Sequence, residues 1–503
     1  MSFTGFLQGA FLAAYFLALG LLCLYGLHRY HLVYLRHRYR DRPPPSRAVH
    51  DWPTVTVQLP IYNERYVAPR LLETIRRLDY PRDRLEVQVL DDSTDDTPLL
   101  LEPAIARLRA EGFDIHPLRR TDRRGYKAGA LAAGLEQAGG EFIAIFDADF
   151  CPPPDFLRRM LPYFTDDNIG MVQARWGFLN AGYSWLTRAQ SVFLDAHFLI
   201  EHLARHRSGR FFNFNGTAGV WRRNCLTDAG GWQADTLTED LDISYRAQLR
   251  GWRFVFAADV IAPSELPVEM TAFRQQQHRW AKGSIQTARK LLGEILASAW
   301  PWKVKIEAFF HLTGNVAMLL LAFFSVALLP SVLIRQSLGW QMASWIELPL
   351  LVLAAPSAAF FYVTAQHAAG AGWWRSLRRV PLLLALGTGM ALNAAMGVLE
   401  ALLGRDSEFR RTPKHGIEIG SDSLTGKGYR GRLDIVTVGE VALAIYFLGG
   451  CVLAVAQRSY VAAPFLLIFF SGYAYVSLLS LRQNAGRFWR PRRLQWSTDT
   501  PAS

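Results

Sequence analysis

The sequence predicts an α/β domain with a doubly wound, parallel sheet, joined to an α-helical membrane region. Long uncharged runs are confined to the N-terminus and to the chain after about residue 305. Residues 50–300 instead carry the mixture of charged and apolar residues typical of a water-facing domain. Within that part, apolar strand-like runs alternate with helical patterns, which indicates parallel strands joined by helices.

The first apolar run is Phe6–Leu27, 22 residues without a charged side chain. A helix of about 20 apolar residues crosses the ~30 Å hydrocarbon core of a bilayer. A cleaved signal peptide is the alternative, but basic residues follow this run and none precedes it. We therefore expect a permanent membrane helix within residues 1–30 and a basic, proline-containing linker over residues 31–52.

Five further apolar runs follow the water-facing part: Ala308–Ile334, Ile346–Gln366, Val380–Leu403, Ile435–Ala456 and Val461–Leu481. Arginines cluster after the first run of the chain and after the last, and such flanks remain in the cytosol. Because the α/β domain and the C-terminus then share one side, one of the five runs does not cross. Val380–Leu403, with three glycines, an asparagine and a glutamate, is expected to be an interfacial or re-entrant helix.

This topology divides the rest of the chain. Residues 53–265 form the α/β domain, residues 266–305 form interfacial helices, and residues 306–482 form the membrane region. A loop at about residues 404–434 and a basic tail over residues 483–503 lie in the cytosol with the α/β domain.

The net charge of +12 first suggests a nucleic-acid partner. The excess arginines, however, lie beside the apolar runs, and the sequence has none of the motifs of nucleic-acid-binding proteins. We therefore predict no nucleic-acid partner and assign the charge to the membrane flanks. The four cysteines are scattered without metal-ligand spacing, so we expect them to be packing residues.

Polar side chains follow three of the predicted strands at the point where each strand ends. These strands and their polar ends are Thr54–Leu59 with Asn63 and Glu64, Leu85–Leu90 with Asp91 and Asp92, and Phe142–Phe146 with Asp147 and Asp149. Asp, Asn and Pro also end strands and open turns for purely structural reasons. Three such ends in succession favour a ligand site, because open α/β sheets bind ligands beyond the carboxyl ends of their strands.

Two acidic pairs suggest chemistry. Asp147 and Asp149 flank one small residue at a strand end, where both carboxylates can ligate one Mg²⁺ or Mn²⁺ ion that also binds phosphates. Thr238-Glu239-Asp240 has the pattern of a helix start, with Thr238 as the cap. Either Glu239 or Asp240 can act as a general base toward a hydroxyl group, and the residues alone do not decide between them.

Three further segments carry candidate binding residues. In Gln276-Gln-His-Arg279-Trp280, Arg279 suits a diphosphate and Trp280 a sugar ring, although an amphipathic interfacial helix has the same composition. Lys127 suits a phosphate or is a solvated lysine at a helix start. The loop Phe212–Gly219, which contains Asn215, Gly216 and Thr217, suits a carbohydrate or a tight turn.

These motifs, in this order, resemble those of family 2 inverting glycosyltransferases of the GT-A fold, especially the cellulose-synthase-like branch. The similarity runs from about Pro53 to Ile295 and more loosely to Lys414. It implies that Asp240 is the catalytic base, with Glu239 beside it, and that Trp280 stacks on the acceptor sugar. The residues implied or assigned for the nucleotide sugar are Asp91, Asp92, Glu64, Lys127, Asp147, Gln276 and Arg279; for the metal they are Asp147 and Asp149; for the acceptor they also include Asn215, Gly216 and Thr217.

A last motif, Phe409-Arg-Arg-Thr-Pro-Lys414, is similar to the Phe-x-Val-Thr-x-Lys gating loop of that branch. Arg411 stands where the family has Val, while Thr412 and Lys414 match and are assigned to the nucleotide sugar. The short C-terminal tail and the small number of spans resemble the compact glucomannan synthases.

The resemblance implies a processive enzyme that extends a β-linked hexose polymer from UDP-glucose or GDP-mannose, with Mg²⁺ or Mn²⁺, and passes the polymer across the membrane. The alternative is a single-transfer glycolipid synthase, such as a ceramide or diacylglycerol glucosyltransferase, which shares the first four motifs. A catalytically inactive membrane scaffold is a third hypothesis, but every motif acid is present. The expected partners are the nucleotide sugar, a glycan or lipid acceptor, and membrane lipids.

Overall fold

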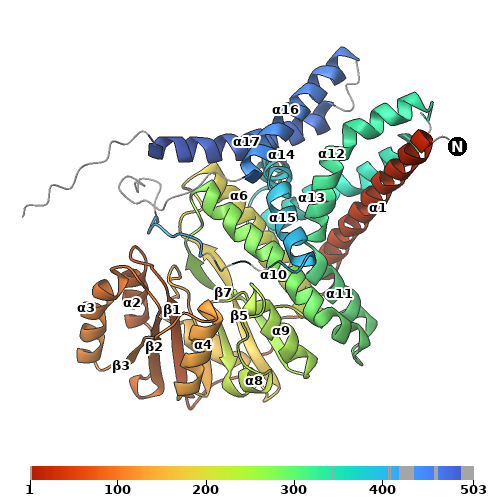
Figure 1. The fold of residues 1–503 in the computed structure, drawn as a ribbon. Helices are drawn as coiled ribbons and strands as arrows, with labels where there is room; N and C mark the ends of the chain where they lie inside the picture. The colour runs from red at the N-terminus through yellow and green to blue at the C-terminus, as the bar shows by residue number, and fades with distance from the viewer. Residues whose placement is uncertain are drawn as a thin grey trace, which may run out of the picture.

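A computed structural model describes residues 3–340, 344–405, 407, 409, 411–418, 435–457 and 463–488. An α/β domain occupies one end of the molecule and a group of long helices the other (Figure 1). The first helix, α1 (Phe3–Arg38), lies with the C-terminal helices although the whole α/β domain separates them in sequence. This helix continues eight residues past the expected 1–30 segment.

A seven-stranded sheet with the order β3-β2-β1-β4-β6-β5-β7 forms the centre of the α/β domain. Its strands are β1 (Val55–Ile61), β2 (Leu85–Asp91), β3 (Asp114–Leu118), β4 (Phe142–Ile145), β5 (Ile169–Phe178), β6 (Gly219–Arg222) and β7 (Arg253–Ser264). The first four strands are parallel, as expected. The expectation of a fully parallel sheet was wrong for β6, which runs antiparallel to both of its neighbours.

Helices cover both faces of the sheet. One face packs against α2 (Ala68–Arg76), α3 (Thr97–Ala110) and α5 (Phe156–Met160). The other packs against α4 (Tyr126–Gln137), the π-helix η3 (His197–His202), α7 (Leu203–Arg207), α8 (Arg223–Asp228) and α9 (Glu239–Leu249). Short 3₁₀ turns, η1 (Arg82–Arg84) and η2 (Leu161–Tyr163), complete the domain.

Three amphipathic helices connect the sheet to the long helices. They are α6 (Trp185–Ala196), α10 (Met270–Ala297) and α11 (Trp302–Thr313). Helix α10 contacts α9 on the sheet side, and α11 and two helices of the C-terminal group on the other. It therefore lies between the α/β domain and the long helices (Figure 1). The segment Gln276–Trp280 on α10 lies between them as well.

In the described part of the chain, six helical segments are long and apolar enough to cross a membrane. They involve α1, α12 (Val316–Ser337), α13 (Ser344–Ala368), the pair α14 (Trp373–Gly389) and α15 (Ala391–Leu402), α16 (Ile435–Ala456) and α17 (Ala463–Phe488). The segment expected to be interfacial or re-entrant is the α14–α15 pair, which bends at Met390. Its non-crossing role stays a prediction.

One contact fixes α14 against α17. Gly389 and Gly472 lie backbone to backbone, since a Cβ on Gly389 would meet the Gly472 carbonyl oxygen at 2.4 Å. A side chain at either position would force the two helices apart. The two glycines therefore set the spacing of this helix pair.

Candidate active site

A cavity of about 580 Å³ lies between the carboxyl edge of the sheet, α9, α10 and the long helices. The predicted site residues that line it are Glu64, Asp92, Lys127, Asp147, Asp149, Asn215, Gly216, Glu239, Asp240, Gln276, Arg279, Trp280, Thr412 and Lys414. Residues from the two ends of a 350-residue stretch thus meet at one site. Asp149, Asp240 and Arg279 face the same cavity.

The acids after β4 are held by a lysine and a threonine. The ammonium group of Lys127 lies 2.5 Å from Asp147 Oδ1 and donates to the Gly216 carbonyl oxygen at 2.9 Å. The Asp147 backbone N–H donates to the Thr217 hydroxyl. Burial disfavours the charged form of Lys127, but the carboxylates of Asp147, Glu239 and Asp240 together outweigh this and raise the pKa of Lys127.

The second acid of this pair, Asp149, is held from the far end of the chain. Lys414 Nζ lies 2.6 Å from Asp149 Oδ2 and donates to the Glu265 carbonyl oxygen. The next residue, His415, donates its backbone N–H to the Glu265 carboxylate at 2.9 Å. The segment predicted to be a gating loop therefore lies across the cavity and contacts the carboxyl end of β7.

Arg411, which stands where the family motif has Val, forms an ion pair with a residue outside the loop. Its guanidinium lies 2.6 Å from Glu64 Oε1, at the end of β1. Burial raises the pKa of Glu64 to about 7, although Arg411 opposes the shift. The ion pair attaches the loop to the first strand end.

At the start of α9, Glu239 and Asp240 both line the cavity. Burial, with the neighbouring Glu239 charge, raises the pKa of Asp240 to about 7, while Lys127 and Arg279 act in the opposite direction. Asp240 Oδ2 lies just 3.1 Å from where a Cβ on Gly216 would stand. Asp240 is therefore placed against the Gly216 loop and next to the Lys127–Asp147 pair.

The prediction that Thr238 caps α9 with its side chain was wrong. Thr238 occupies the N-cap position, but its hydroxyl lies 3.3 Å from the Thr287 hydroxyl on α10. The methyl side of Thr238 faces Gly283, where a Cβ would approach it to 2.5 Å. Thr238 thus connects the start of α9 to α10 and positions the two acids that follow it.

On α10, Arg279 lies under the aromatic ring of Phe409 at 4.7 Å, and Phe409 stacks on Tyr126 at 5.6 Å. The Arg279 Nε–H has no hydrogen-bond acceptor in the described part of the chain. Gln276 and Trp280 line the cavity beside it. A buried cationic donor of this kind suits an anionic ligand such as a diphosphate.

Two assigned residues do not line the cavity. Asp91 is buried and accepts the Ser93 backbone N–H at 2.9 Å, so it organises its own turn. Thr217 is buried behind Asp147. Asp92 does line the cavity, where its carboxylate accepts hydrogen bonds from the Arg120 guanidinium.

The backbone around the cavity adopts rare conformations. Asn63, Tyr126 and Ala218, with φ between 50° and 54°, are the non-glycine residues with positive φ in the described part of the chain. They follow β1, begin α4 and precede β6, close to the acids described above. Backbone strain of this kind concentrates at functional sites.

Sequence reasoning missed a buried polar wall of the cavity. Glu307 on α11 lies 3.1 Å from His28 on α1 and 3.0 Å from Arg205 on α7. Arg205 also binds Glu201, and the Asn215 side-chain amide donates a hydrogen bond to His197 Nε2 at 2.9 Å. These residues come from four separate segments with no common spacing, so no sequence pattern revealed them.

The comparisons with known proteins agree with this arrangement. Residues 53–283 match the family model described as glycosyltransferase like family 2. The chain is 34% identical to glucomannan 4-beta-mannosyltransferase 1 of Oryza sativa subsp. japonica, over 87% of this chain and 85% of the relative. The chain belongs to the glucomannan 4-beta-mannosyltransferase family. This confirms the predicted family 2, cellulose-synthase-like resemblance.

Other members of the family show similar values. The chain is 35% identical to the probable glucomannan 4-beta-mannosyltransferase 11 of Arabidopsis thaliana, over 79% of this chain and 90% of the relative. A solved structure of the mannosyltransferase PcManGT from Pyrobaculum calidifontis, in complex with GDP-Man and Mn2+, covers 79% of this chain and 99% of its own, with a TM-score of 0.50 and 22% identity. The likeness confirms the GT-A fold. As a member of this family, the protein is a hexosyltransferase.

Proposed function

We propose that this glycosyltransferase extends a β-linked mannan or glucomannan by repeated transfer of mannosyl groups from GDP-mannose. Its relatives are named for 4-β-mannosyl transfer, and two of them are covered over 85% and 90% of their length. The observation that carries the proposal is the meeting of Asp240, Lys127 and Arg279 in one cavity. Transfer of a sugar from a nucleoside diphosphate needs a base for the acceptor hydroxyl and positive charge for the departing diphosphate.

The transfer divides between these side chains. Asp240 accepts the proton of the acceptor hydroxyl as its oxygen bonds to the anomeric carbon of the donor sugar. The bond from that carbon to the diphosphate breaks on the opposite face, so the configuration inverts. Lys127 and Arg279 bind the negative charge that develops on the departing nucleoside diphosphate.

The donor set after β4 fits a divalent cation. Asp147 and Asp149 present carboxylate oxygens on the same cavity, and Mg²⁺ or Mn²⁺ combines one or two such ligands with phosphate oxygens and waters. Lys127 and Lys414 already neutralise these carboxylates, which marks the position as one that attracts positive charge. Asp147 and Asp149 would hold the ion, which supplies charge neutralisation at the diphosphate.

The acceptor side of the cavity supports a polymeric product. Its lining continues from Trp280 to Tyr25 on α1, Phe310 on α11 and Met318 on α12. Aromatic faces suit sugar rings, and helices α1 and α12 belong to segments able to cross a membrane. We propose that the growing chain leaves along this wall, from a cytosolic catalytic domain through the membrane helices.

The test uses full-length protein in lipid nanodiscs with Mn²⁺ and radiolabelled GDP-mannose or UDP-glucose in parallel. We expect GDP-mannose to give long products that an endo-β-1,4-mannanase degrades. The Asp240→Asn protein, at equal concentration, is the negative control. Products that stop after one sugar on a lipid would contradict processive synthesis and favour the glycolipid-synthase alternative.

A further inference from the structure

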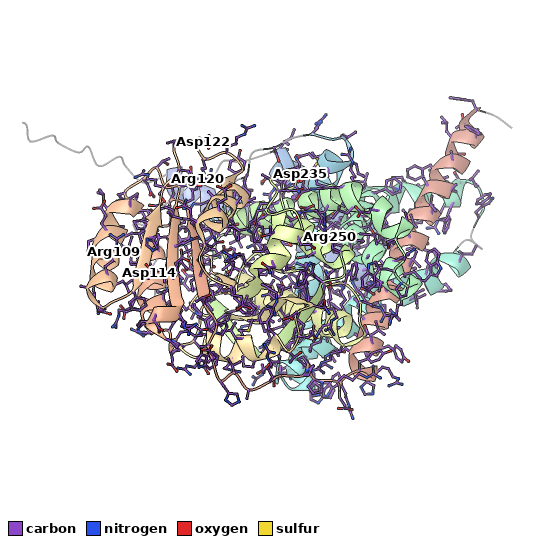
Figure 2. All side chains as sticks on the ribbon, turned by 90° about the horizontal axis from the view of Figure 1, so that it is seen from below. Arg109, Asp114, Arg120, Asp122, Asp235 and Arg250 are labelled. Carbon is purple, nitrogen blue, oxygen red and sulfur yellow. The ribbon has the colours of Figure 1, made fainter. Side chains whose placement is uncertain are left out.

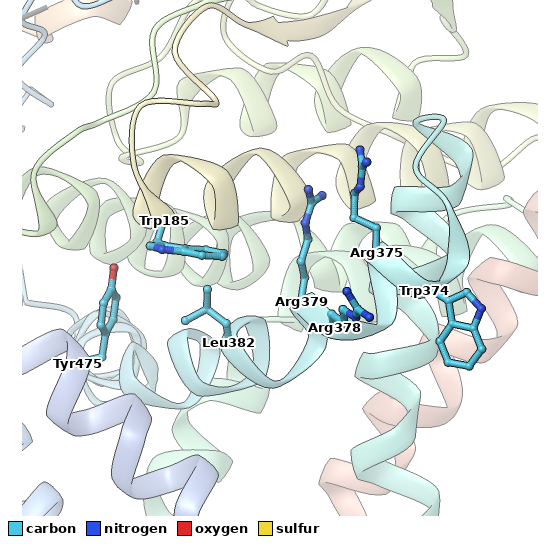
Figure 3. Close-up of a pocket in the computed structure, with 7 residues that line it drawn as sticks. All are labelled: Trp185, Trp374, Arg375, Arg378, Arg379, Leu382 and Tyr475. Carbon is cyan, nitrogen blue, oxygen red and sulfur yellow. The ribbon is translucent and has the colours of Figure 1, made fainter. Parts of the chain in front are cut away.

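A second, open pocket of about 760 Å³ lies where α6, α14 and α17 meet. It shares no lining residue with the catalytic cavity. Its lining consists of Trp185, Trp374, Arg375, Arg378, Arg379, Leu382 and Tyr475. Figure 3 shows Arg375 and Arg379 pointing from α14 toward α6, with Trp185 lying above Leu382.

The pocket carries positive charge that no carboxylate of the described residues neutralises. Arg375, Arg378 and Arg379 come from two successive turns at the start of α14, and the charges of Arg188 and Arg375 repel that of Arg379. None of these four arginines forms an ion pair with a carboxylate in the described part of the chain. Gln366 on α13 accepts a hydrogen bond from Arg379 at 3.0 Å and so fixes its direction.

Clustered arginines without acidic partners repel one another, so their arrangement costs free energy unless an anion joins them. Arginine is the side chain best suited to phosphate, because its planar donors bind two oxygens at once. The charge of the pocket is therefore complementary to a phosphate group.

The aromatic residues of the pocket indicate where that phosphate comes from. Trp185 and Trp374 remain 64% and 77% exposed. Exposed tryptophans beside arginines, at the end of a segment able to cross a membrane, are typical of the headgroup layer of a bilayer. Leu382 continues the pocket along α14 into the apolar part of that segment, where an acyl chain can lie.

From the charge, the aromatic rim and the apolar extension together, we infer that this pocket binds the phosphate headgroup of an anionic phospholipid. The lipid bridges α6 of the catalytic domain to α14 and α17 of the membrane region. Basic pockets between membrane helices on the cytosolic side bind anionic headgroups in this way. This side agrees with the cytosolic position proposed for the domain.

The experiment measures lipid binding to the full-length protein by native mass spectrometry in detergent. Equal amounts of palmitoyl-oleoyl phosphatidylglycerol and phosphatidylcholine are added, so that only the headgroup differs. We expect the phosphatidylglycerol complex to dominate on the order of a hundredfold, because each of the three arginines near an anionic lipid contributes roughly fivefold. Equal binding of the two lipids would overturn the proposal.

Variants locate the site. Arg378→Gln, which removes a guanidinium with no hydrogen bond in the described structure, should lower the preference about fivefold, and the triple Gln variant of Arg375, Arg378 and Arg379 on the order of a hundredfold. The triple Lys variant keeps the charge and should retain most of the preference. The matched control replaces three exposed arginines of the catalytic domain, Arg77, Arg84 and Arg107, by Gln.

A control that lost the preference equally would show a general charge effect and contradict the site. In a parallel measurement, inorganic phosphate is added at millimolar concentration to compete with the lipid. If phosphate removes the phosphatidylglycerol preference, the pocket binds a free anion rather than a lipid, and the proposal is wrong. If the triple Gln variant fails to fold, Arg378→Gln and the triple Lys variant carry the test.

Discussion

Lys414 lies 2.6 Å from Asp149, although 265 residues separate them in sequence. A second lysine, Lys127, holds Asp147 at 2.5 Å. Each carboxylate expected to ligate a cation is therefore already bound to an ammonium group, one from the catalytic domain and one from the loop after the membrane helices. The negative charges of Asp147 and Asp149 are therefore balanced by the protein's own lysines, and Lys414 of the loop supplies one of them.

Lys414→Met should weaken donor binding. The variant loses the contact that attaches the loop to Asp149 and leaves that buried carboxylate without its partner. We expect the KM for the nucleotide sugar to rise about tenfold or more, since a hydrogen bond to a charged group contributes roughly 1.5–3 kcal/mol. Initial rates against donor concentration measure this, with exposed Lys303→Met as the control. An unchanged KM would show that the loop does not contact the donor.

Asp240→Asn should remove the base while keeping its size. General-base catalysis contributes about a hundredfold to ten-thousandfold, and we expect kcat to fall by that amount with a small change in KM. The control is Asp235→Asn, a partly exposed acid (Figure 2) that precedes α9 and pairs with Lys290. Comparable loss in both variants would argue against a specific role for Asp240.

The raised pKa of Asp240 gives activity a defined pH dependence. The base acts in its deprotonated form, so kcat/KM should fall about tenfold per pH unit below about 7. Burial also raises the pKa of Glu64 to about 7, so Glu64→Gln tests which acid is responsible. A pH profile that persists in Glu64→Gln supports Asp240.

The same shift predicts the sign of a stability change. A carboxyl group whose pKa is higher in the folded protein binds protons more tightly there, so folding loses stability as pH rises from about 4 toward 7. Asp240→Asn, which mimics the protonated acid, should therefore raise the thermal unfolding midpoint at pH 8 and leave it nearly unchanged at pH 4. A lower midpoint at pH 8 would contradict the burial of the charge.

Metal removal should abolish transfer reversibly. We expect EDTA to reduce the rate at least about a hundredfold and added Mn²⁺ or Mg²⁺ to restore it, because a cation at a phosphoryl oxygen contributes several kcal/mol. In Asp149→Asn, the half-saturating metal concentration should rise about tenfold or more. Full activity of the purified protein in EDTA would contradict a metal at Asp147 and Asp149.

Two glycines of α10 form a matched pair. A Cβ at Gly283 would meet the Thr238 side chain at 2.5 Å, whereas a Cβ at Gly293 would meet nothing within 4 Å. Gly293→Ala should stabilise the helix by about 0.5–1 kcal/mol. Gly283→Ala should destabilise the protein by roughly 1–3 kcal/mol and lower kcat, because Thr238 and the following acids must shift. Equal effects would show that Thr238 does not position Asp240.

Sequence reasoning anticipated much of this architecture because the strongest signals are local. The strands ending at Ile61 and Asp91 alternate apolar and polar residues, and the polar residues that follow them, Glu64 and Asp92, do meet at one cavity. The strand β3 was missed because Asp114–Leu118 contains a single fully buried residue, Ile115, and a proline. The strand β6 was also missed together with its direction, since its four consecutive buried residues form too short a run and give no indication of which way a strand runs.

Contacts between segments far apart in the chain could not be predicted from the sequence. The departure of Arg411 from the family motif was visible, but its partner Glu64 stands 347 positions away in sequence and no spacing rule relates them. The wall formed by His28, Arg205 and Glu307 has the same origin. Such side chains become neighbours only when the membrane helices pack on the α/β domain.

The backbone contact between Gly389 and Gly472 has a mechanical consequence. Helices that touch through their main chains cannot slide or tilt without a direct clash, so α14 and α17 act as a fixed frame. The loop carrying Arg411 and Lys414 is attached through long side chains, which can exchange partners while the frame stays still. Donor exchange would then be accommodated by the loop, while the spacing of α14 and α17 stays constant.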